Sequence, residues 1–506
     1  MALATSSLIF FLLLLPLLTI AQTTNGRVSV GESLTASKTS SSWLSPSEDF
    51  AFGFHQPDKN KDLFLLSIWF EKIPAKTLVW WCVDKNESPV LVPPGSAIKL
   101  TAEKGLVLSH PGGAELWKSD IAMQEVAYGV MYDSGNFAIE SRNSDKLWQS
   151  FDQPTDTLLP TQIMVINGQL FSRKNESNFS QGKFRLGLLE NGNLDLNSVN
   201  LPTKLVYEEA YYSSGTNDSA NSSNSGFRLI FNESGDVYVL RRNRQRSSIG
   251  IGAALPTPSS DYYQRLTLDF DGVFAQYSYP KKTTGSGTNW STVWSLPENI
   301  CSRFGQIGSG ACGFSSICRL NDKGRPSCEC PPGFSLLDPN DSYGNCKRNG
   351  ELDCDEQISP EDAYDFKVLP GVNFAGNDYE LYAPNYDMQH CRTACLHDCT
   401  CVIAVYYEGR CWKKRLPISN GRYDSSDKGM ALVKVRKGDL PPTLPKFPKA
   451  GGDKKQQIFN ITGSILLVKL LTTSPSPVFR LDYSGIVPIY GGIPPLISLS
   501  QYGNHV

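Results

Sequence analysis

Short apolar runs, separated by turn residues, recur through the first part of the chain. Between residues 22 and 150 they include residues 63–70, 77–81, 105–108 and 126–131, and no stretch sustains a helical period. Regularly spaced short runs of this kind predict an all-β domain, built as a sandwich, a barrel or a prism. Four tryptophans of this region are predicted core anchors, with sugar stacking as the alternative: Trp69, Trp80, Trp117 and Trp148.

A second β-rich region follows and extends to about residue 296. Residues 183–196, 227–240 and 262–279 each read as a hairpin, the first with Asn191-Gly192 at its turn. These hairpins repeat the layout of the one around residues 133–136. We therefore predict that residues 151–296 form a second β domain, of the same design as the first.

Cysteines are concentrated in the next part of the chain. Two even sets of six indicate two small modules held by disulfides, although spacing alone permits fifteen pairings in each. The thiols at 391, 395 and 399 recur every four residues, which predicts a helix with all three on one face, followed by a strand over residues 401–407. The two sets are Cys301, Cys312, Cys318, Cys328, Cys330 and Cys346, then Cys354, Cys391, Cys395, Cys399, Cys401 and Cys411.

The thirteenth cysteine, Cys82, stands apart from both sets. It lies in the apolar run of residues 79–83, so we predict a buried free thiol, with intermolecular pairing as the alternative.

The N-terminus indicates export. Residues 1–21 are predicted to be a signal peptide, because the apolar run at residues 8–20 is too short for a comfortable membrane span. Export makes disulfides the default state of the cysteines and gives meaning to glycosylation tripeptides. We expect a secreted or extracellular protein, with the plasma membrane as the alternative. Nine Asn-x-Ser/Thr tripeptides occur, at Asn86, Asn175, Asn178, Asn217, Asn221, Asn232, Asn289, Asn340 and Asn460.

The charge balance excludes one class of partner. A formal net charge of −2 and a pI near 6.3 give no electrostatic footprint for nucleic acid.

We also predict no metal and no cofactor. His390 and His397 lie beside cysteines and raise the question of zinc, but oxidising export and the even cysteine count argue against it.

Two stretches resemble the bulb-type (monocot mannose-binding) lectin domain of plant S-domain, or G-type lectin, receptor-like kinases. They are residues 44–54 (LSPSEDFAFGF) and residues 148–160 (WQSFDQPTDTLLP), and the resemblance extends over about residues 22–435. It implies a β-prism of three four-stranded sheets for residues 22–150 and a second, degenerate lectin-like domain for residues 151–296. The fold class is therefore expected to be mainly β, with tandem β-prism domains followed by small disulfide-rich modules.

The same resemblance implies a sugar site. The family builds it on the pattern Gln-x-Asp-x-Asn-x-Val-x-Tyr, whose polar side chains hydrogen-bond sugar hydroxyls. The nearest stretch here, residues 131–139, retains Asp133 and Asn136 at a spacing of three rather than two and lacks the Gln and the Tyr. These two residues are the candidate carbohydrate-binding residues. The sequence Asp-Ser-Gly-Asn also forms a good turn, which needs no ligand to explain it.

The two cysteine sets resemble two known modules. Residues 297–347, with Cys-x-Cys followed by Gly333-Phe334, resemble an EGF-like module, and residues 350–435 resemble a PAN/apple module. The first resemblance implies the disulfides Cys301–Cys318, Cys312–Cys328 and Cys330–Cys346. The second implies Cys391–Cys411, Cys395–Cys401 and Cys354–Cys399.

Residues 436–506 depart from the family as a Pro-rich linker and an atypical tail. Residues 458–471 are too short and too interrupted for a membrane span, and no kinase motif occurs in the chain. We predict a non-catalytic recognition protein for a mannose-type glycan or glycoprotein, in defence or recognition signalling, with homo- or hetero-association through the EGF-like and PAN modules. The alternatives are a secreted glycoside-processing enzyme and a weakly membrane-anchored truncated receptor.

Overall fold

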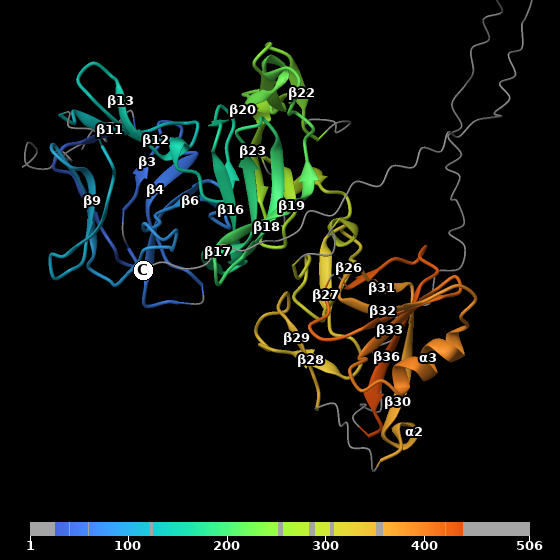
Figure 1. Cartoon of the computed structure of the whole chain (residues 1–506). Coiled ribbons are helices and arrows are strands. Elements are labelled where there is room, and N and C mark those ends of the chain that lie inside the picture. The colour runs from blue at the N-terminus through green and yellow to red at the C-terminus, as the bar shows by residue number, and fades with distance from the viewer. Residues whose placement is uncertain are drawn as a thin grey trace, which may run out of the picture. The chain divides into compact units, whose positions relative to one another are not determined.

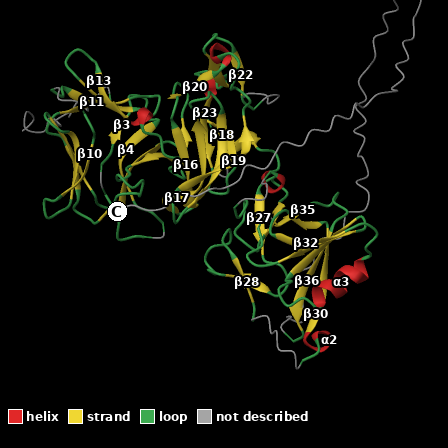
Figure 2. Ribbon diagram, viewed as in Figure 1, coloured by secondary structure: helices red, strands yellow, loops and turns green. Residues whose placement is uncertain are grey.

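A computed structural model describes residues 26–438, apart from residues 40, 59, 122–124, 251–256, 283–288, 304–307, 351–357 and 420 (Figure 1). The predicted signal peptide, Cys354, Asn460 and the tail beyond residue 438 lie outside the described residues. Strands dominate the described residues, whose α-helices are the short α2 (Pro360–Ala363) and α3 (Met388–Leu396) (Figure 2). The mainly β fold class is thus confirmed.

The first thirteen strands form three antiparallel sheets around one core. Their inward side chains, among them Val28, Ile98, Leu106 and Phe137, belong to a single apolar cluster. The sheet orders are β1-β11-β12-β13, β10-β9-β8-β2 and β3-β4-β5-β6, and β7 adds a fifth strand to the third sheet by pairing with β5. The bounds are β1 (Arg27–Ser29), β2 (Ser33–Thr35), β3 (Trp43–Leu44), β4 (Phe50–His55), β5 (Phe64–Phe70), β6 (Leu78–Trp81), β7 (Leu91–Val92), β8 (Ala97–Thr101), β9 (Gly105–Ser109), β10 (Glu115–Lys118), β11 (Tyr128–Met131), β12 (Phe137–Glu140) and β13 (Lys146–Gln149).

The next twelve strands repeat this design. Three four-stranded antiparallel sheets, in the orders β14-β23-β24-β25, β15-β20-β21-β22 and β16-β17-β18-β19, enclose a second apolar cluster. The bounds are β14 (Thr157–Leu158), β15 (Ile163–Val165), β16 (Gln169–Asn175), β17 (Asn178–Leu188), β18 (Leu194–Asn200), β19 (Leu205–Ser213), β20 (Gly226–Phe231), β21 (Val237–Arg241), β22 (Arg246–Ser248), β23 (Tyr262–Leu268), β24 (Phe274–Pro280) and β25 (Ser291–Leu296). We call the two three-sheet bodies the first and the second prism.

Three of the four predicted tryptophan anchors are confirmed as buried core residues, namely Trp69, Trp80 and Trp148. Trp117 is half-buried and packs edge-on against Trp148, with ring centroids 6.1 Å apart. Cys82 is free and buried beside these residues, as predicted.

One five-residue turn closes the predicted hairpins. In residues 132–136, 189–193, 232–236 and 269–273, the first N–H donates to the last carbonyl and the fourth N–H donates to the first carbonyl. The fourth residue is always glycine with a positive φ, 86° at Gly135 and 91° at Gly192. A β-carbon on Gly135 would stand 2.4 Å from Leu159, so both the dihedral angle and the space require glycine there.

The two prisms pack directly on each other. The ring of Phe70 lies 5.2 Å from the rings of both Tyr263 and Trp290, measured between centroids. The Trp290 indole N–H also donates to Thr77 Oγ1 at 2.9 Å. Residues of the second prism therefore complete the apolar cluster of the first.

The cysteine-rich part contains three further sheets. A five-stranded sheet has the order β30-β36-β33-β34-β32, and α3 packs against it. A four-stranded sheet, β27-β26-β35-β31, joins strands of both cysteine sets, since β26 and β35 pair in parallel. β28 pairs with β29. The bounds are β26 (Ile317–Leu320), β27 (Pro326–Glu329), β28 (Phe334–Leu336), β29 (Cys346–Arg348), β30 (Tyr364–Pro370), β31 (Val372–Phe374), β32 (Asp378–Tyr382), β33 (Ile403–Tyr407), β34 (Arg410–Lys414), β35 (Gly421–Tyr423) and β36 (Met430–Arg436).

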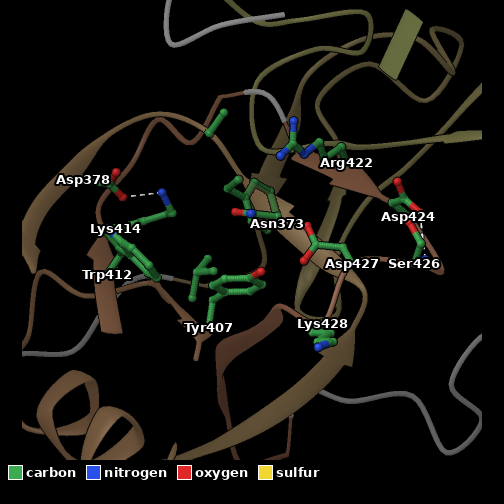
Figure 3. Close-up of a pocket in the computed structure, with 13 residues that line it drawn as sticks. Asn373, Asp378, Tyr407, Trp412, Lys414, Arg422, Asp424, Ser426, Asp427 and Lys428 are labelled. Atoms are coloured by element: carbon green, nitrogen blue, oxygen red, sulfur yellow. Dashed lines mark hydrogen bonds and ion pairs between the residues drawn. The ribbon is translucent and has the colours of Figure 1, made fainter. Parts of the chain in front are cut away.

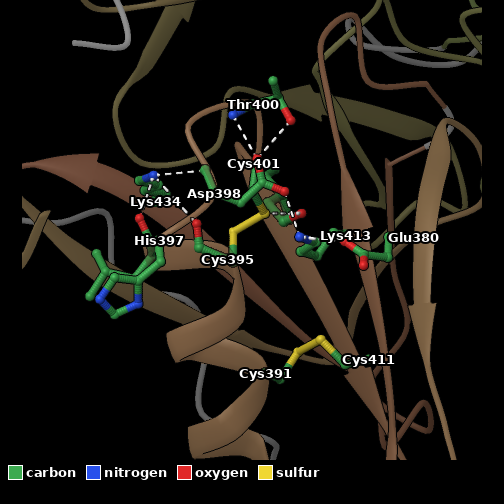
Figure 4. The surroundings of a disulfide bond; sticks show 12 residues. Glu380, Cys391, Cys395, His397, Asp398, Thr400, Cys401, Cys411, Lys413 and Lys434 are labelled. Carbon is green, nitrogen blue, oxygen red and sulfur yellow. Dashed lines mark hydrogen bonds and ion pairs between the residues drawn. A yellow bond between two sulfur atoms is a disulfide. The ribbon is translucent and has the colours of Figure 1, made fainter. Parts of the chain in front are cut away.

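The predicted helix is shorter than the cysteine spacing suggested. Cys391 and Cys395 lie on α3 and are buried, but the helix ends at Leu396, so the prediction that Cys399 shares its face is wrong. The physical reason is a turn after the helix. Asp398 Oδ1 accepts the N–H of Thr400 at 2.9 Å and its hydroxyl at 2.8 Å, which turns the chain toward β33 (Figure 4).

Candidate functional site

The two residues predicted to bind sugar, Asp133 and Asn136, lie in the same turn but in different environments. Asp133 is exposed, and its Oδ1 accepts the Ser47 N–H at 2.8 Å and the Ser47 hydroxyl at 2.6 Å. Although partial burial acts to raise it, these bonds and the charge of Lys72 lower the pKa of Asp133. Its carboxylate is therefore ionised at neutral pH and fixed in position.

Asn136 is only 2% exposed and is bonded within the protein. Its Nδ2 donates to Gln149 Oε1 at 2.9 Å, and its Oδ1 accepts from the Ser150 hydroxyl at 3.1 Å and the Phe151 N–H at 3.2 Å. These bonds tie the turn to the end of β13 and to η1 (Ser150–Asp152). A ligand would have to displace them to reach the Asn136 side chain.

Asp133 lines a polar cleft of about 530 Å³. The turn at residues 132–136 of the first prism and the matching turn at residues 232–236 of the second both contribute to it, through Asp133, Ser134, Glu233 and Ser234. Serine hydroxyls and tyrosine rings complete the wall. We call this feature the Asp133 cleft, and its remaining lining includes Asp49, Ser259, Ser260, Tyr262, Tyr263 and Lys281.

The carboxylate of Asp49 contacts a tyrosine and two lysines in and beside the Asp133 cleft. Its Oδ1 accepts the Tyr263 hydroxyl at 2.8 Å and lies 3.0 Å from Lys72 Nζ, while Lys281 Nζ is 3.8 Å from Oδ2. Burial, and then the Asp49 carboxylate, raise the pKa of Tyr263 well above its usual range. The phenol thus stays protonated and can act as a fixed hydrogen-bonding group. The sequence pattern did not predict Asp49, Tyr263 or Lys281 as site residues. Glu233 could be placed, because the hairpin at residues 227–240 repeats the layout of the one around residues 133–136.

A second pocket, of about 560 Å³, lies in the cysteine-rich part. Figure 3 shows Trp412 and Lys414 on one side of it and Asp424 and Asp427 on the other. Lys414 is 1% exposed, donates to the Gly376 carbonyl at 3.1 Å and pairs with Asp378. Burial lowers its pKa, and Asp378 opposes that effect. Trp412 and Tyr407 also line the pocket, and aromatic side chains are enriched where proteins contact one another.

Five disulfides lie among the described residues: Cys301–Cys318, Cys312–Cys328, Cys330–Cys346, Cys391–Cys411 and Cys395–Cys401. Each is a pair that the family resemblance implies. Cys399 is also disulfide-bonded, whereas its expected partner Cys354 lies outside the described residues.

The two histidines near these cysteines contact carboxylates. His390 Nδ1 lies 2.9 Å from Asp387, and His397 Nε2 lies 2.9 Å from Glu361. No group of three or more His, Cys, Asp or Glu side chains in the described part of the chain could hold a metal ion.

The predicted glycosylation sites differ in exposure. Asn86, Asn217, Asn221, Asn289 and Asn340 are exposed, and Asn175, Asn178 and Asn232 are half-buried. Their modification stays a prediction. No helix within the described residues is long and apolar enough to cross a bilayer.

Sequence comparison gives two domain matches. The family described as D-mannose binding lectin matches residues 77–178, and the family described as S-locus glycoprotein domain matches residues 240–337. The fold and these matches define the class: a mainly β protein that carries a lectin domain.

Several similar proteins are receptor-like kinases of one group. The G-type lectin S-receptor-like serine/threonine-protein kinase RLK1 of Arabidopsis thaliana is 39% identical over 440 residues, which are 83% of this chain and 51% of that protein. LECRK4 of Oryza sativa subsp. indica, from the same group, is 38% identical over 469 residues, 90% of this chain and 57% of that protein. The chain is a homologue of the G-type lectin S-receptor-like kinases, and it spans about half the length of the curated relatives it matches.

Among solved structures, the two-domain lectin Scilla campanulata agglutinin covers 53% of this chain and 94% of its own, at 14% identity and a TM-score of 0.19. At this score the similarity carries no structural argument.

Proposed function

We propose that the chain is a non-catalytic recognition protein that binds glycans outside the cell through its prisms. The observation that carries the proposal is the Asp133 cleft, where an ionised carboxylate, hydroxyls and tyrosine rings from both prisms surround about 530 Å³. Such a wall offers fixed donors and acceptors to a polyhydroxylated ligand, with rings for its apolar faces. The match to a D-mannose binding lectin family supports mannose-type glycans as the ligand class.

The proposed role is capture rather than turnover. Asp133 holds Ser47, and Asp49 holds Tyr263 and two lysines, so these carboxylates serve as fixed structural and binding groups. We further propose that the pocket around Trp412 contributes to homo- or hetero-association with a protein partner, in receptor-type signalling such as defence or recognition. The names of the relatives support the receptor-like setting.

A glycan array followed by titration tests the proposal. We expect saturable binding of mannose-type glycans without product formation, and at least a fivefold loss of signal in Asp133→Ala. Asp145→Ala is the matched control, because Asp145 is an exposed aspartate in another turn of the first prism and lines no described pocket. A folded protein that binds no glycan on the array would contradict the proposal, and release of free sugar would replace it with the enzymatic alternative.

A further inference from the structure

A third pocket, of about 280 Å³, lies at the junction of the two prisms. Trp81 and Glu87 of the first prism line it together with Thr155 and with Phe171 and Gln181 of the second. It shares no lining residue with the Asp133 cleft. We call it the junction pocket.

Buried polar groups without partners gather around the junction pocket. Three buried side-chain atoms without a hydrogen-bond partner among the described residues belong to residues that line this pocket: Trp81 Nε1, Thr155 Oγ1 and Ser172 Oγ. Trp81 is 3% exposed and Ser172 is 1% exposed. Each of these three atoms has almost no accessible surface of its own, so the polar groups that a ligand in the pocket reaches are the side chains exposed on its wall.

The rest of the wall indicates the chemistry of that molecule. Gln153, Gln169 and Gln181 line the pocket, and their side chains make no hydrogen bond to another described residue. The charged side chains on the wall are Asp152 and Glu87, which disfavour an anion. The nearby cation, Arg173, is paired with the fully buried Asp156 at 2.9 Å. Carboxamides, with phenylalanine rings beside them, suit a neutral ring that carries several hydroxyl groups.

We infer that the junction pocket is a second saccharide subsite, which takes one or two sugar rings. Its volume lies near the lower end of ligand pockets, which are roughly 300–1,000 Å³, so it suits a terminal sugar rather than a long chain. The inference rests on the proposed function, because it names a further site for the same ligand class. Residues 77–178, which the D-mannose binding lectin family matches, supply nearly all of its wall.

Two sources of sugar have this chemistry. One is a separate glycan, and the other is an N-linked glycan of the chain itself. The predicted acceptors Asn86 and Asn178 immediately precede Glu87 and Phe179, both of which line the pocket. A glycan attached at either position would start one residue from the pocket wall.

Titration calorimetry with methyl α-D-mannopyranoside, on the protein before and after enzymatic removal of N-glycans, tests the inference. Gln153→Ala/Gln181→Ala removes two carboxamides from the wall of the junction pocket, and it breaks no hydrogen bond of these side chains to a described residue. Gln169→Ala, at the exposed rim, is a second variant that leaves the fold untouched. We expect at least tenfold weaker binding at one of two sites in these variants, whereas Asp133→Ala weakens the other.

The outcomes separate the possibilities. A junction site that binds the mannoside only after N-glycan removal identifies the chain's own glycan as its occupant, and equal binding in both forms identifies a separate glycan. If the junction variants bind as the wild type does and Asp133→Ala loses all binding, the junction pocket is no saccharide site, although the proposed function stands. If no form binds the mannoside, both proposals fall.

Discussion

The prisms and the cysteine-rich part are stabilised by different kinds of residue. In the prisms the largest fully buried side chains are aromatic, including Phe52, Phe70 and Phe137 in the first and Phe184, Phe231 and Phe274 in the second. The prisms contain one cysteine, the free and buried Cys82. The cysteine-rich part instead holds five described disulfides and buries Lys413, Lys414 and Lys434, each less than 5% exposed.

Buried lysines are tolerable only because each one has partners. Lys434 Nζ donates to the carbonyls of Leu396 at 3.0 Å and Asp398 at 3.1 Å, at the negative end of α3. Burial lowers the pKa of Lys434 to about 8. Lys413 pairs with Asp398 and Glu380 (Figure 4). The cysteine-rich part thus adds covalent and directional links to its apolar clusters, whereas a prism is fixed by packing.

The largest expected effect is in the prism core. Phe137 is fully buried, and its ring lies 4.5 Å from that of Phe52, between centroids. Phe137→Ala should lower the free energy of unfolding of the prisms by about 3–5 kcal/mol, because it removes apolar contacts and leaves a cavity. Calorimetry of the thermal transitions measures this change. Leu205→Ala is the control, since Leu205 is 68% exposed and its truncation should leave the transition in place.

Loss of one disulfide should lower the stability of the cysteine-rich part. Cys391–Cys411 closes a loop with a sequence separation of 20 between α3 and β34. Cys391→Ala/Cys411→Ala should destabilise the cysteine-rich part by about 3 kcal/mol through the entropy of the unfolded chain. Denaturation followed by proteolysis of that part reads out the effect. Cys82→Ala serves as the control without a disulfide, and an equal loss in both variants would break the contrast between the two parts.

Local features of the sequence predicted local features of the fold. The turns at residues 132–136 and 189–193 could be predicted, because the glycine at the fourth position meets a requirement of the backbone itself. The helix around Cys391 and Cys395 was predicted from spacing alone. Its end at Leu396 was not, although Asp398 and Thr400 form a turn that the sequence Asp-Cys-Thr allows.

The site could be predicted only in part, because its members meet through tertiary packing. Asp49 and Tyr263 are 214 residues apart and share a hydrogen bond in the Asp133 cleft. No spacing rule connects them. Asn136 is of a residue type that binds sugars, yet its side chain is already hydrogen-bonded to Gln149 and Ser150. A sequence motif identifies a hydrogen-bonding group but not the partner that it uses.

The smallest expected effect is an acid-dependent loss of stability in the cysteine-rich part. Burial alone would raise the pKa of Asp398, but hydrogen bonds from Lys413, Tyr379 and Thr400 hold it well below its usual range. A carboxyl whose pKa is lower in the folded state adds stability above its unfolded pKa, about 3.8, and that stability is lost as the pH falls below this value. The unfolding transition of the cysteine-rich part should therefore move to lower temperature between about pH 4 and pH 2. Asp398→Asn keeps the shape of the side chain and removes its titration. Its unfolding temperature should be lower at pH 7 and should fall less as the pH decreases. An unchanged fall would assign the acid sensitivity to Glu380, whose pKa Lys413 and Tyr382 also lower.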